Sequence, residues 1–371
     1  MLKISFAILT IILLVACSDP ESPTEASSTE VSTGSNEAKS LASGPCADTN
    51  GLKTYCGFSN PEDIVVTPDG KQLIISEMGE FMTDSPGALV LFDLDTSTTN
   101  PMPLTFAEPE INWGDSDCPQ PDPALFSPHG IDLITRQDGR YQLLVVNHGG
   151  REAVEMFDVV QSEANWQAQW RGCALPPEDP FINDVSGLGD GGFLVTHMWN
   201  KTTPFEEVAT KLINGENTGW IWRWHPETGF SRLTESDQQM PNGIAVSKDN
   251  RFAFVNIYMG NKTIKIDLDT GEQVGEFSVR QPDNITLDDE GNLWIASHQH
   301  DPINETCGEV ETGACLLPFQ IVKADPDTLE TKVFLEFHGE PMGYTTVATR
   351  AGNVIYMGTA HGDRIASMPI Q

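Results

Sequence analysis

The chain has 371 residues and carries 54 Asp and Glu against 21 Lys and Arg, which gives a formal net charge of −33. This charge argues against a nucleic-acid partner, because phosphate backbones are bound by clustered Lys and Arg. With 39% hydrophobic residues, 32 Gly and 25 Pro, the composition is typical of a turn-rich globular protein rather than a helical or disordered one.

The first 43 residues are predicted to direct export and to form a tether. An apolar run ends at Ala16 and is too short to cross roughly 30 Å of hydrocarbon, so residues 1–16 are interpreted as a signal peptide. Leu14-Val15-Ala16-Cys17 resembles the lipobox of bacterial lipoproteins, whose cysteine is acylated, and Ser18 is typical of outer-membrane lipoproteins. An ordinary secretory signal is the alternative. Residues 17–43 lack aromatic side chains and are expected to be a flexible, lipid-anchored tether.

Six cysteines remain in the predicted globular body, residues 44–371. An even number in an exported protein favours disulfides, and no CxxC pair indicates a zinc site. Sequence proximity favours a pairing that leaves the two middle cysteines for each other, although other connectivities stay open: Cys46 with Cys56, Cys118 with Cys173, and Cys307 with Cys315.

A short polar segment followed by an aliphatic strand, a turn and a second strand recurs six times. The copies begin at Glu62-Asp63, His129-Gly130, Asn183-Asp184, Asn242-Gly243, Asp283-Asn284 and Tyr344-Thr345. In five copies a turn signal separates the strands: Asp69-Gly70, Asp138-Gly139, Asp190-Gly191, Asp249-Asn250 and Glu290-Gly291. Further strands follow several pairs. The repeat therefore predicts an all-β protein, a six-bladed β-propeller of four-stranded antiparallel blades.

The repeat starts are predicted to form a ring, because the innermost strand of each propeller blade lines the central channel. The ring is rich in carboxylate and amide oxygens, the ligands that Ca²⁺ prefers: Glu62, Asn183, Asn242, Asp283 and Asn284. The alternative is that these residues only cap turns. Adjacent residues of a regular strand face opposite sides, so both members of a pair point inward only where the strand is entered through a loop.

Two histidines belong to one predicted hairpin. His129 lies in the ring, and His148 ends the paired strand 143–148. Because a hairpin brings its strands together, one imidazole is expected to orient the other as a general base for water. The alternative is that they are two unrelated surface histidines. His197 and His298 also end strands and are expected to line the same pocket.

These motifs, together with Ser127-Pro128-His129-Gly130-Ile131 and the 144–148 strand, resemble those of the paraoxonases over about residues 57–368. The resemblance implies a calcium-dependent hydrolase that opens lactones and cleaves aryl esters, small-molecule substrates, on a six-bladed propeller. It implies that Glu62, Asn183, Asn242, Asp283 and Asn284 hold a catalytic calcium in the central channel. It also implies that His129 and His148 form the catalytic dyad. A second, structural calcium would be held by Asp63, Asp184 and the backbone carbonyl of Ile131.

Three features depart from that family. No cysteine follows Cys315, so propeller closure is expected to rest on hydrogen bonds instead of the family's disulfide. The stretch 204–217, where the family has an apolar helix, is polar, and the acidic, Pro-rich insertion around 115–122 has no counterpart. Two other functions stay open. One is a sugar lactonase like gluconolactonase, using Glu62, Asn242 and Asp283. The other is a non-catalytic, calcium-stabilised binding propeller.

Overall fold

The computed structural model describes residues 42–80, 85–106, 108–162 and 165–370. The predicted signal peptide, Cys17 and almost the whole predicted tether lie outside these residues. Ala42 and Ser43, assigned to the tether from the sequence, already belong to the body. Ala42 pairs with Cys315, and the Ser43 N–H donates to the Ala314 carbonyl at 2.8 Å. None of the helical segments in the described ranges has the length and apolar character needed to cross a bilayer.

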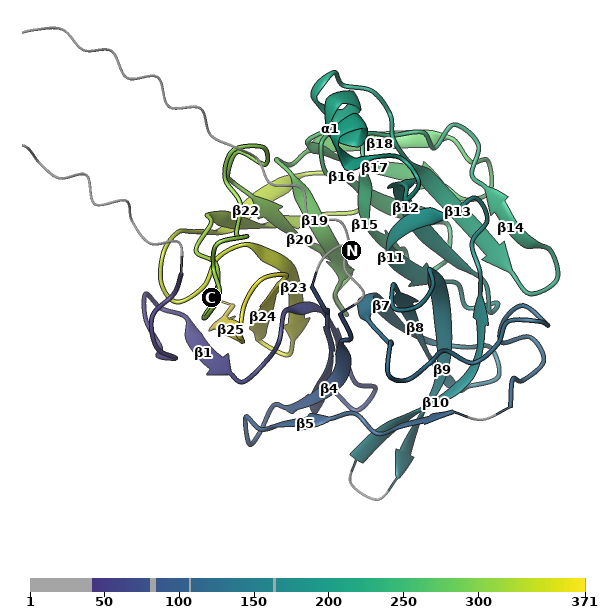
Figure 1. Ribbon diagram of the computed structural model, residues 1–371, viewed down its shortest axis with the longest axis horizontal. Helices are drawn as coiled ribbons and strands as arrows, with labels where there is room; N and C mark the ends of the chain where they lie inside the picture. Colours follow the sequence, from purple (N-terminus) through teal and green to yellow (C-terminus); the bar gives the residue numbers. More distant parts are fainter. Residues whose placement is uncertain (1–41, 81–84, 107, 163–164, 371) are drawn as a thin grey trace, which may run out of the picture. The chain divides into compact units, whose positions relative to one another are not determined.

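Six sheets surround a common centre (Figure 1), and the strands of each sheet follow one another from the centre outward. The first blade consists of β2 (Pro61–Val66), β3 (Gln72–Glu77), β4 (Ala88–Asp93) and β5 (Thr99–Pro101). The second consists of β7 (Pro128–Thr135), β8 (Tyr141–Asn147), β9 (Ala153–Ser162) and β10 (Asn165–Ala174). The third consists of β11 (Pro180–Gly187), β12 (Phe193–Asn200), β13 (Trp220–His225) and β14 (Gly229–Arg232).

The remaining blades follow the same order. The fourth consists of β15 (Pro241–Val246), β16 (Phe252–Ile257), β17 (Lys262–Asp267) and β18 (Gln273–Ser278). The fifth consists of β19 (Pro282–Leu287), β20 (Leu293–His298), β21 (Phe319–Ala324) and β22 (Thr331–Phe337). The sixth consists of β23 (Thr345–Ala351), β24 (Val354–Thr359), β25 (Arg364–Pro369) and β1 (Lys53–Cys56). The innermost strands contact one another in a closed ring, so the predicted six-bladed propeller is confirmed.

Two elements add to this plan. The second blade has a fifth strand, β6 (Leu104–Phe106), which runs parallel to β10. Helix α1 (Phe205–Ile213) lies between β12 and β13 and buries Val208 and Leu212. The helix occupies the stretch that the sequence marks as polar, and its first turn carries Glu206 and Glu207.

Hydrogen bonds close the propeller, as the missing cysteine predicted. The N-terminal strand β1 pairs antiparallel with the C-terminal strand β25, and Figure 1 shows the two lying side by side. Arg364 is 1% exposed, and its guanidinium donates to the carbonyls of Gly44 at 3.1 Å and Pro341 at 3.2 Å. The first and the last strands of the described residues therefore share one sheet, which closes the ring.

The turns within the blades have the backbone geometry that the sequence predicts. Gly70, Gly139, Gly191 and Gly291 have positive φ, and Asn250 takes the equivalent conformation in the fourth blade. Positive φ costs Gly nothing and Asn little, which is why these residues stand at the hairpin turns.

Irregular pairing explains how adjacent side chains both face the channel. Every innermost strand has a register shift against its partner near its start, for example between Pro61 and Asp63 and between Pro282 and Ile285. A β-bulge re-aims side chains that a regular strand would send to opposite faces. Five innermost strands are also preceded directly by a residue with positive φ: Asn60, Asp179, Met240, Gln281 and Tyr344.

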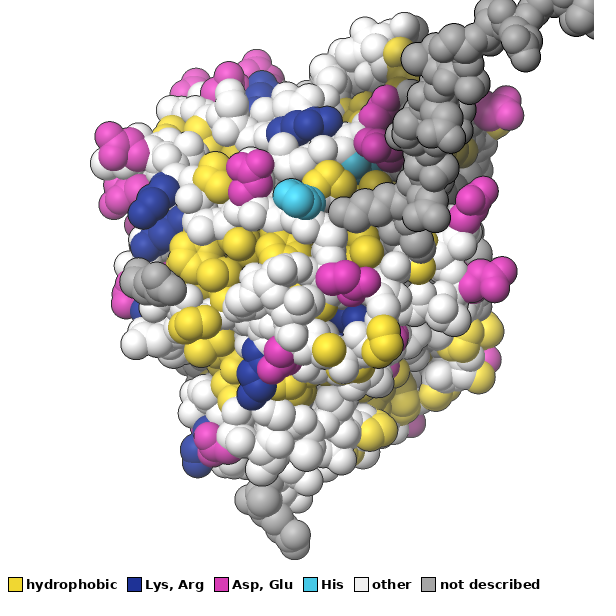
Figure 2. Space-filling view, turned by 90° about the vertical axis from the view of Figure 1, so that its left-hand side faces the viewer, with side chains coloured by type: hydrophobic (Ala, Val, Ile, Leu, Met, Phe, Trp, Pro, Cys, Tyr) yellow, Lys and Arg dark blue, Asp and Glu magenta, His cyan; other side chains and the backbone are white. Residues whose placement is uncertain are grey.

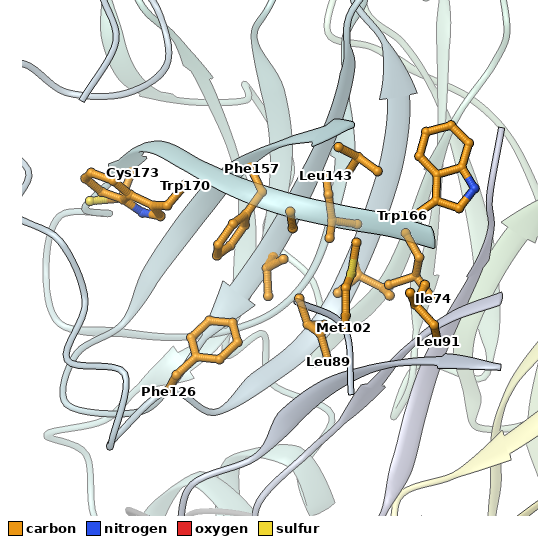
Figure 3. Close-up of a cluster of buried hydrophobic side chains, with 14 of the residues drawn as sticks. Ile74, Leu89, Leu91, Met102, Phe126, Leu143, Phe157, Trp166, Trp170 and Cys173 are labelled. Atoms are coloured by element: carbon orange, nitrogen blue, oxygen red, sulfur yellow. The ribbon is translucent and has the colours of Figure 1, made fainter. Parts of the chain in front are cut away.

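Apolar side chains fill the spaces between neighbouring blades. In Figure 3, Leu89 and Leu91 of the first blade pack against Leu143, Phe157 and Trp166 of the second. Burial of such a side chain contributes about 1.5–3 kcal/mol. These contacts hold the blades in fixed positions around the channel, which is what a site assembled from several blades requires.

The three disulfides pair the cysteines that sequence proximity favours: Cys46–Cys56, Cys118–Cys173 and Cys307–Cys315. The second joins the acidic insertion to β10. Trp113, beside the insertion, is fully buried, with the guanidinium of Arg136 4.4 Å from its ring centre. Asp115 accepts a hydrogen bond from the indole of Trp224 at 2.8 Å. The insertion is thus packed against the second and third blades.

The surface agrees with the acidic composition. Figure 2 shows Asp and Glu side chains spread over the visible face, with Lys and Arg mostly as separate side chains among them. That face presents no basic patch of the kind that binds a phosphate backbone.

Candidate active site and metal centre

The predicted ring residues lie where the repeat placed them. Each comes from the start of an innermost strand and is buried, at exposures of 1–7%: Glu62 and Asp63 on β2, His129 on β7, Asn183 and Asp184 on β11, Asn242 on β15, Asp283 and Asn284 on β19. Ile131 lies on β7, two residues after His129. His148 directly follows β8 and is 8% exposed. The ring therefore combines side chains from five blades.

Direct contacts link the members of the ring. The Asn284 amide donates to Glu62 Oε1 at 2.9 Å, and His129 Nε2 lies 3.5 Å from the same oxygen. Asn242 hydrogen-bonds the Asp283 side chain. Glu62 is thus in contact with both the predicted metal ligands and the predicted dyad.

Four buried oxygens of the ring have no hydrogen-bond donor among the described residues: Glu62 Oε2, Asn183 Oδ1, Asn242 Oδ1 and Asn284 Oδ1. A buried oxygen without a donor costs about 1–3 kcal/mol, so four in one channel require a partner. All four belong to the five residues proposed as calcium ligands. An oxygen-only set of carboxylate and amide groups is what a calcium ion binds.

The charges in the channel also call for a cation. Burial, followed by the charge of Glu62, raises the pKa of Asp63 to about 8. Burial and neighbouring carboxylates likewise raise the pKa values of Asp184 and Asp283. Within the described ranges, no three His, Cys, Asp or Glu side chains alone are arranged as a metal-ligand set. A calcium site in the channel would therefore need the Asn amide oxygens as well as the carboxylates. Together these oxygens form a ligand set that suits calcium.

Asp63 and Asp184, predicted to bind a second calcium, serve backbone groups of neighbouring blades. Asp63 accepts the N–H groups of Ile64 at 2.8 Å and Ile131 at 2.7 Å. Asp184 accepts those of Val185 and Ile244, both at 2.8 Å. These carboxylates tie the first blade to the second and the third to the fourth. The second calcium stays a prediction.

The two histidines of the predicted dyad are in contact. His129 Nδ1 and His148 Nε2 are 2.7 Å apart, a hydrogen-bond distance. Burial would lower the pKa of His129, but the charge and hydrogen bond of Glu62, together with the charges of Asp63 and Glu152, outweigh it and raise that pKa. Burial lowers the pKa of His148. The arrangement can take a proton at His129 Nε2, the nitrogen that faces Glu62.

Close approach of the blades explains the glycines that follow the ring residues. A Cβ on Gly130 would lie 2.5 Å from Asp184 Oδ1, and one on Gly243 would lie 2.5 Å from the Asp283 carbonyl. Any larger residue would push neighbouring ligand strands apart.

Of the two further histidines expected at the pocket, His298 belongs to this site. Its Nε2 lies 3.4 Å from Asp283 Oδ2, and its Nδ1 is 2.9 Å from the Tyr258 hydroxyl. His197 packs on Trp220 at a ring distance of 3.8 Å, and burial lowers its pKa to about 4.

Glu152 was not identified from the sequence, although its carboxylate binds His148 Nδ1 at 2.9 Å. The signal was present as a histidine and a glutamate four residues apart in the turn between β8 and β9. It was not distinctive, because the chain contains many acidic turn residues. Tyr344 was identified as a repeat start but was given no role in the site. Its ring stacks on that of His298 at 4.5 Å, and it precedes β23 of the sixth blade.

Comparisons with known proteins identify the family of this chain. The family model described as arylesterase matches residues 56–365. Human serum paraoxonase/arylesterase 1 is 24% identical over 250 residues, which cover 64% of this chain and 66% of the human protein, just under two thirds of its length. The mouse protein of the same name is 24% identical over 312 residues, covering 80% of this chain and 82% of the mouse protein.

A solved structure supports the fold alone. A gluconolactonase from Xanthomonas campestris superimposes with a TM-score of 0.50 and 17% identity, covering 86% of this chain and 89% of that one. The family match covers most of the propeller and includes every ring residue. The chain belongs to the arylesterase family.

Proposed function

We propose that this protein is a calcium-dependent hydrolase that opens lactones and cleaves aryl esters. One observation carries the proposal: the His129–His148 pair adjoins a buried ring with four oxygens that lack donors within the described residues. Glu62 touches both groups. The names of the human and mouse relatives support an arylesterase activity.

In the proposed mechanism, a calcium ion would be held by Glu62, Asn183, Asn242, Asp283 and Asn284. When bound, the ion supplies Lewis acidity for the substrate carbonyl and balances the carboxylate charge. His129 Nε2 removes a proton from water as the water oxygen adds to the carbonyl carbon. The carbon–oxygen bond of the ester or lactone then breaks, and His129 returns the proton to the leaving oxygen. His148 holds the His129 ring in place through its 2.7 Å contact.

The first test is an assay of purified protein on aliphatic lactones, sugar lactones and aryl esters before chelation, after it, and after calcium is restored. Activity on aliphatic lactones or aryl esters that is lost and regained supports the proposal. Activity confined to sugar lactones would instead favour a gluconolactonase-like function. No hydrolysis, with calcium still raising the melting temperature, would make the channel a structural or binding site.

Replacement of His129 by Gln should separate catalysis from metal binding. General base catalysis contributes about 10²–10⁴-fold, so kcat should fall by that order while calcium affinity, measured by calorimetry, stays unchanged. Replacement of Glu62 by Gln should damage both. The exposed His338→Gln provides a matched control that should leave kcat unaltered. Full activity of His129→Gln would contradict its role.

We also propose that the protein is exported and anchored in the bacterial outer membrane through acylated Cys17. The three disulfides support an oxidising compartment. Fatty-acid labelling that disappears in Cys17→Ala would support the anchor, and unlabelled protein in the culture medium would contradict it.

A further inference from the structure

His148, the second histidine of the dyad, is contacted on three sides. Glu152 lies in the turn between β8 and β9, and its side chain is 6% exposed. Its two oxygens are 2.9 and 3.0 Å from His148 Nδ1. The ring of Phe181 stacks parallel to the His148 ring at 4.7 Å. On the third side, His129 Nδ1 contacts Nε2 of His148.

Glu152 is itself held by the third blade. Lys201, just after β12, donates from Nζ to Oε1 at 2.8 Å, and the Ile182 N–H donates to Oε2 at 3.2 Å. Burial would raise the pKa of Glu152, but His148 and Lys201 outweigh it and lower that pKa. The group is therefore an ionised carboxylate whose position depends on two blades.

An ionised carboxylate accepts hydrogen bonds and donates none. His148 Nδ1 must then carry a proton, and the proton-free Nε2 of neutral His148 accepts from His129. His129 Nδ1 is consequently the donor across the 2.7 Å contact. When His129 is neutral, its free nitrogen is Nε2, the one beside Glu62. The ionised Glu152 carboxylate thus sets which group donates in each hydrogen bond of the Glu152–His148–His129 series.

We propose that Glu152 is a positioning residue for the dyad, which fixes the tautomer and orientation of His148 and, through it, the free nitrogen of His129. Lys201 is the counter-ion that keeps this carboxylate in place. The inference rests on the proposed hydrolytic function, because only a base at His129 gives the tautomer a consequence for turnover. The hydrogen-bond partners of Glu152 within the described residues are His148, Lys201 and the Ile182 N–H, and none of them is a proposed metal ligand.

Replacement of Glu152 by Gln tests the proposal with little change in volume. The two oxygens of Glu152 accept hydrogen bonds from His148, Lys201 and the Ile182 N–H. A glutamine has only one oxygen, so its NH₂ group would face at least one of these donors. A comparable loss of tautomer control in a serine protease triad costs about 10⁴ in kcat. Here, acting through a second imidazole, we expect kcat to fall on the order of 10²-fold, with KM within about twofold. Glu152→Asp should recover part of the loss, because the charge is retained.

Glu155→Gln is the matched control. Glu155 is a fully buried carboxylate on β9 whose hydrogen-bond donors within the described residues are Arg151, Asn147 and the Trp170 indole, and neither histidine of the dyad is among them. Its replacement should lower the melting temperature while kcat stays within about threefold of the original. If Glu155→Gln and Glu152→Gln lower kcat equally, Glu152 acts only by general stability and the proposal fails.

Nitrogen-15 NMR of the histidine rings supplies a readout that needs no turnover. In the unaltered protein, His148 should be protonated at Nδ1 and, when neutral, unprotonated at Nε2; in Glu152→Gln this preference should be lost. If the unaltered protein hydrolyses no ester or lactone, the proposed function fails, and the NMR result alone decides what Glu152 does to His148. An active protein whose kcat and His148 tautomer survive Glu152→Gln would overturn the positioning role.

Discussion

Replacement of Asp63 by Asn should remove a pH dependence of stability that one buried carboxyl group produces in the calcium-free protein. Asp63 is 3% exposed on β2 and is surrounded by the other carboxylates of the channel. Without a cation, burial and the charge of Glu62 raise its pKa from 3.8 to about 8. A carboxyl group whose pKa is raised in the native state stabilises the fold at low pH, and this stabilisation is lost as the pH rises toward about 8.

The magnitude follows from proton linkage. In this window the native state holds a proton that the unfolded state has released, which changes the free energy of unfolding by about 1.4 kcal/mol per pH unit. Between about pH 5 and about pH 8 the loss amounts to about 4 kcal/mol. The amide introduced by Asp63→Asn does not titrate, and its NH₂ group opposes one of the backbone N–H groups of Ile64 and Ile131. That conflict adds a cost of about 1–3 kcal/mol that is independent of pH.

The assay is urea unfolding followed by tryptophan fluorescence, with a calcium chelator present, for both proteins across this pH range. As the pH rises across this range, the free energy of unfolding of the unaltered protein should fall by about 4 kcal/mol relative to that of Asp63→Asn. A difference that stays constant with pH would refute the raised pKa of Asp63. Added calcium should flatten the curve of the unaltered protein, because a bound cation stabilises the ionised carboxylates.

Two further predictions concern the architecture around the site. Removal of the Cys118–Cys173 disulfide, which spans 55 residues, by paired serine replacements should cost about 4 kcal/mol of unfolding free energy through chain entropy. Equal urea midpoints with and without the disulfide would contradict this estimate. Gly130→Ala should weaken calcium binding in calorimetry, because the added Cβ would lie 2.5 Å from Asp184 Oδ1. Gly308→Ala, whose nearest neighbour atom is 3.9 Å away, is the control, and equal calcium affinity of both variants would contradict the prediction.

Much of the fold was predictable because the repeat consists of short-range signals, namely strands and the turns between them. Asp-Gly and similar turn pairs recur between aliphatic strands, and turn chemistry needs no distant partner. The recurrence of Glu62, Asn242 and Asp283 at one repeat position identified ring members, since equivalent positions of a propeller face one channel. The closure of the propeller by hydrogen bonds was also expected from the sequence, because no cysteine follows Cys315, whereas the pairing of β1 with β25 came from the structure.

Other features depended on contacts between distant segments. The bulges that turn both Asp283 and Asn284 into the channel are departures from the two-residue strand period, so no periodic pattern reveals them. The fifth strand β6 and the packing of the 115–122 insertion depend on surfaces contributed by other blades. Neither feature could be predicted from the residues of its own segment.

The division is clearest at the dyad. The residue pattern was enough to predict that His129 and His148 share a hairpin, because the two strands and their turn are contiguous. The free nitrogen of each ring could not be predicted in this way, because it depends on Glu152, and Glu152 is held by Ile182 and Lys201 from the next blade. Residue types and spacing specify which groups are available, whereas hydrogen-bond direction is determined by donors and acceptors that meet only when the blades pack.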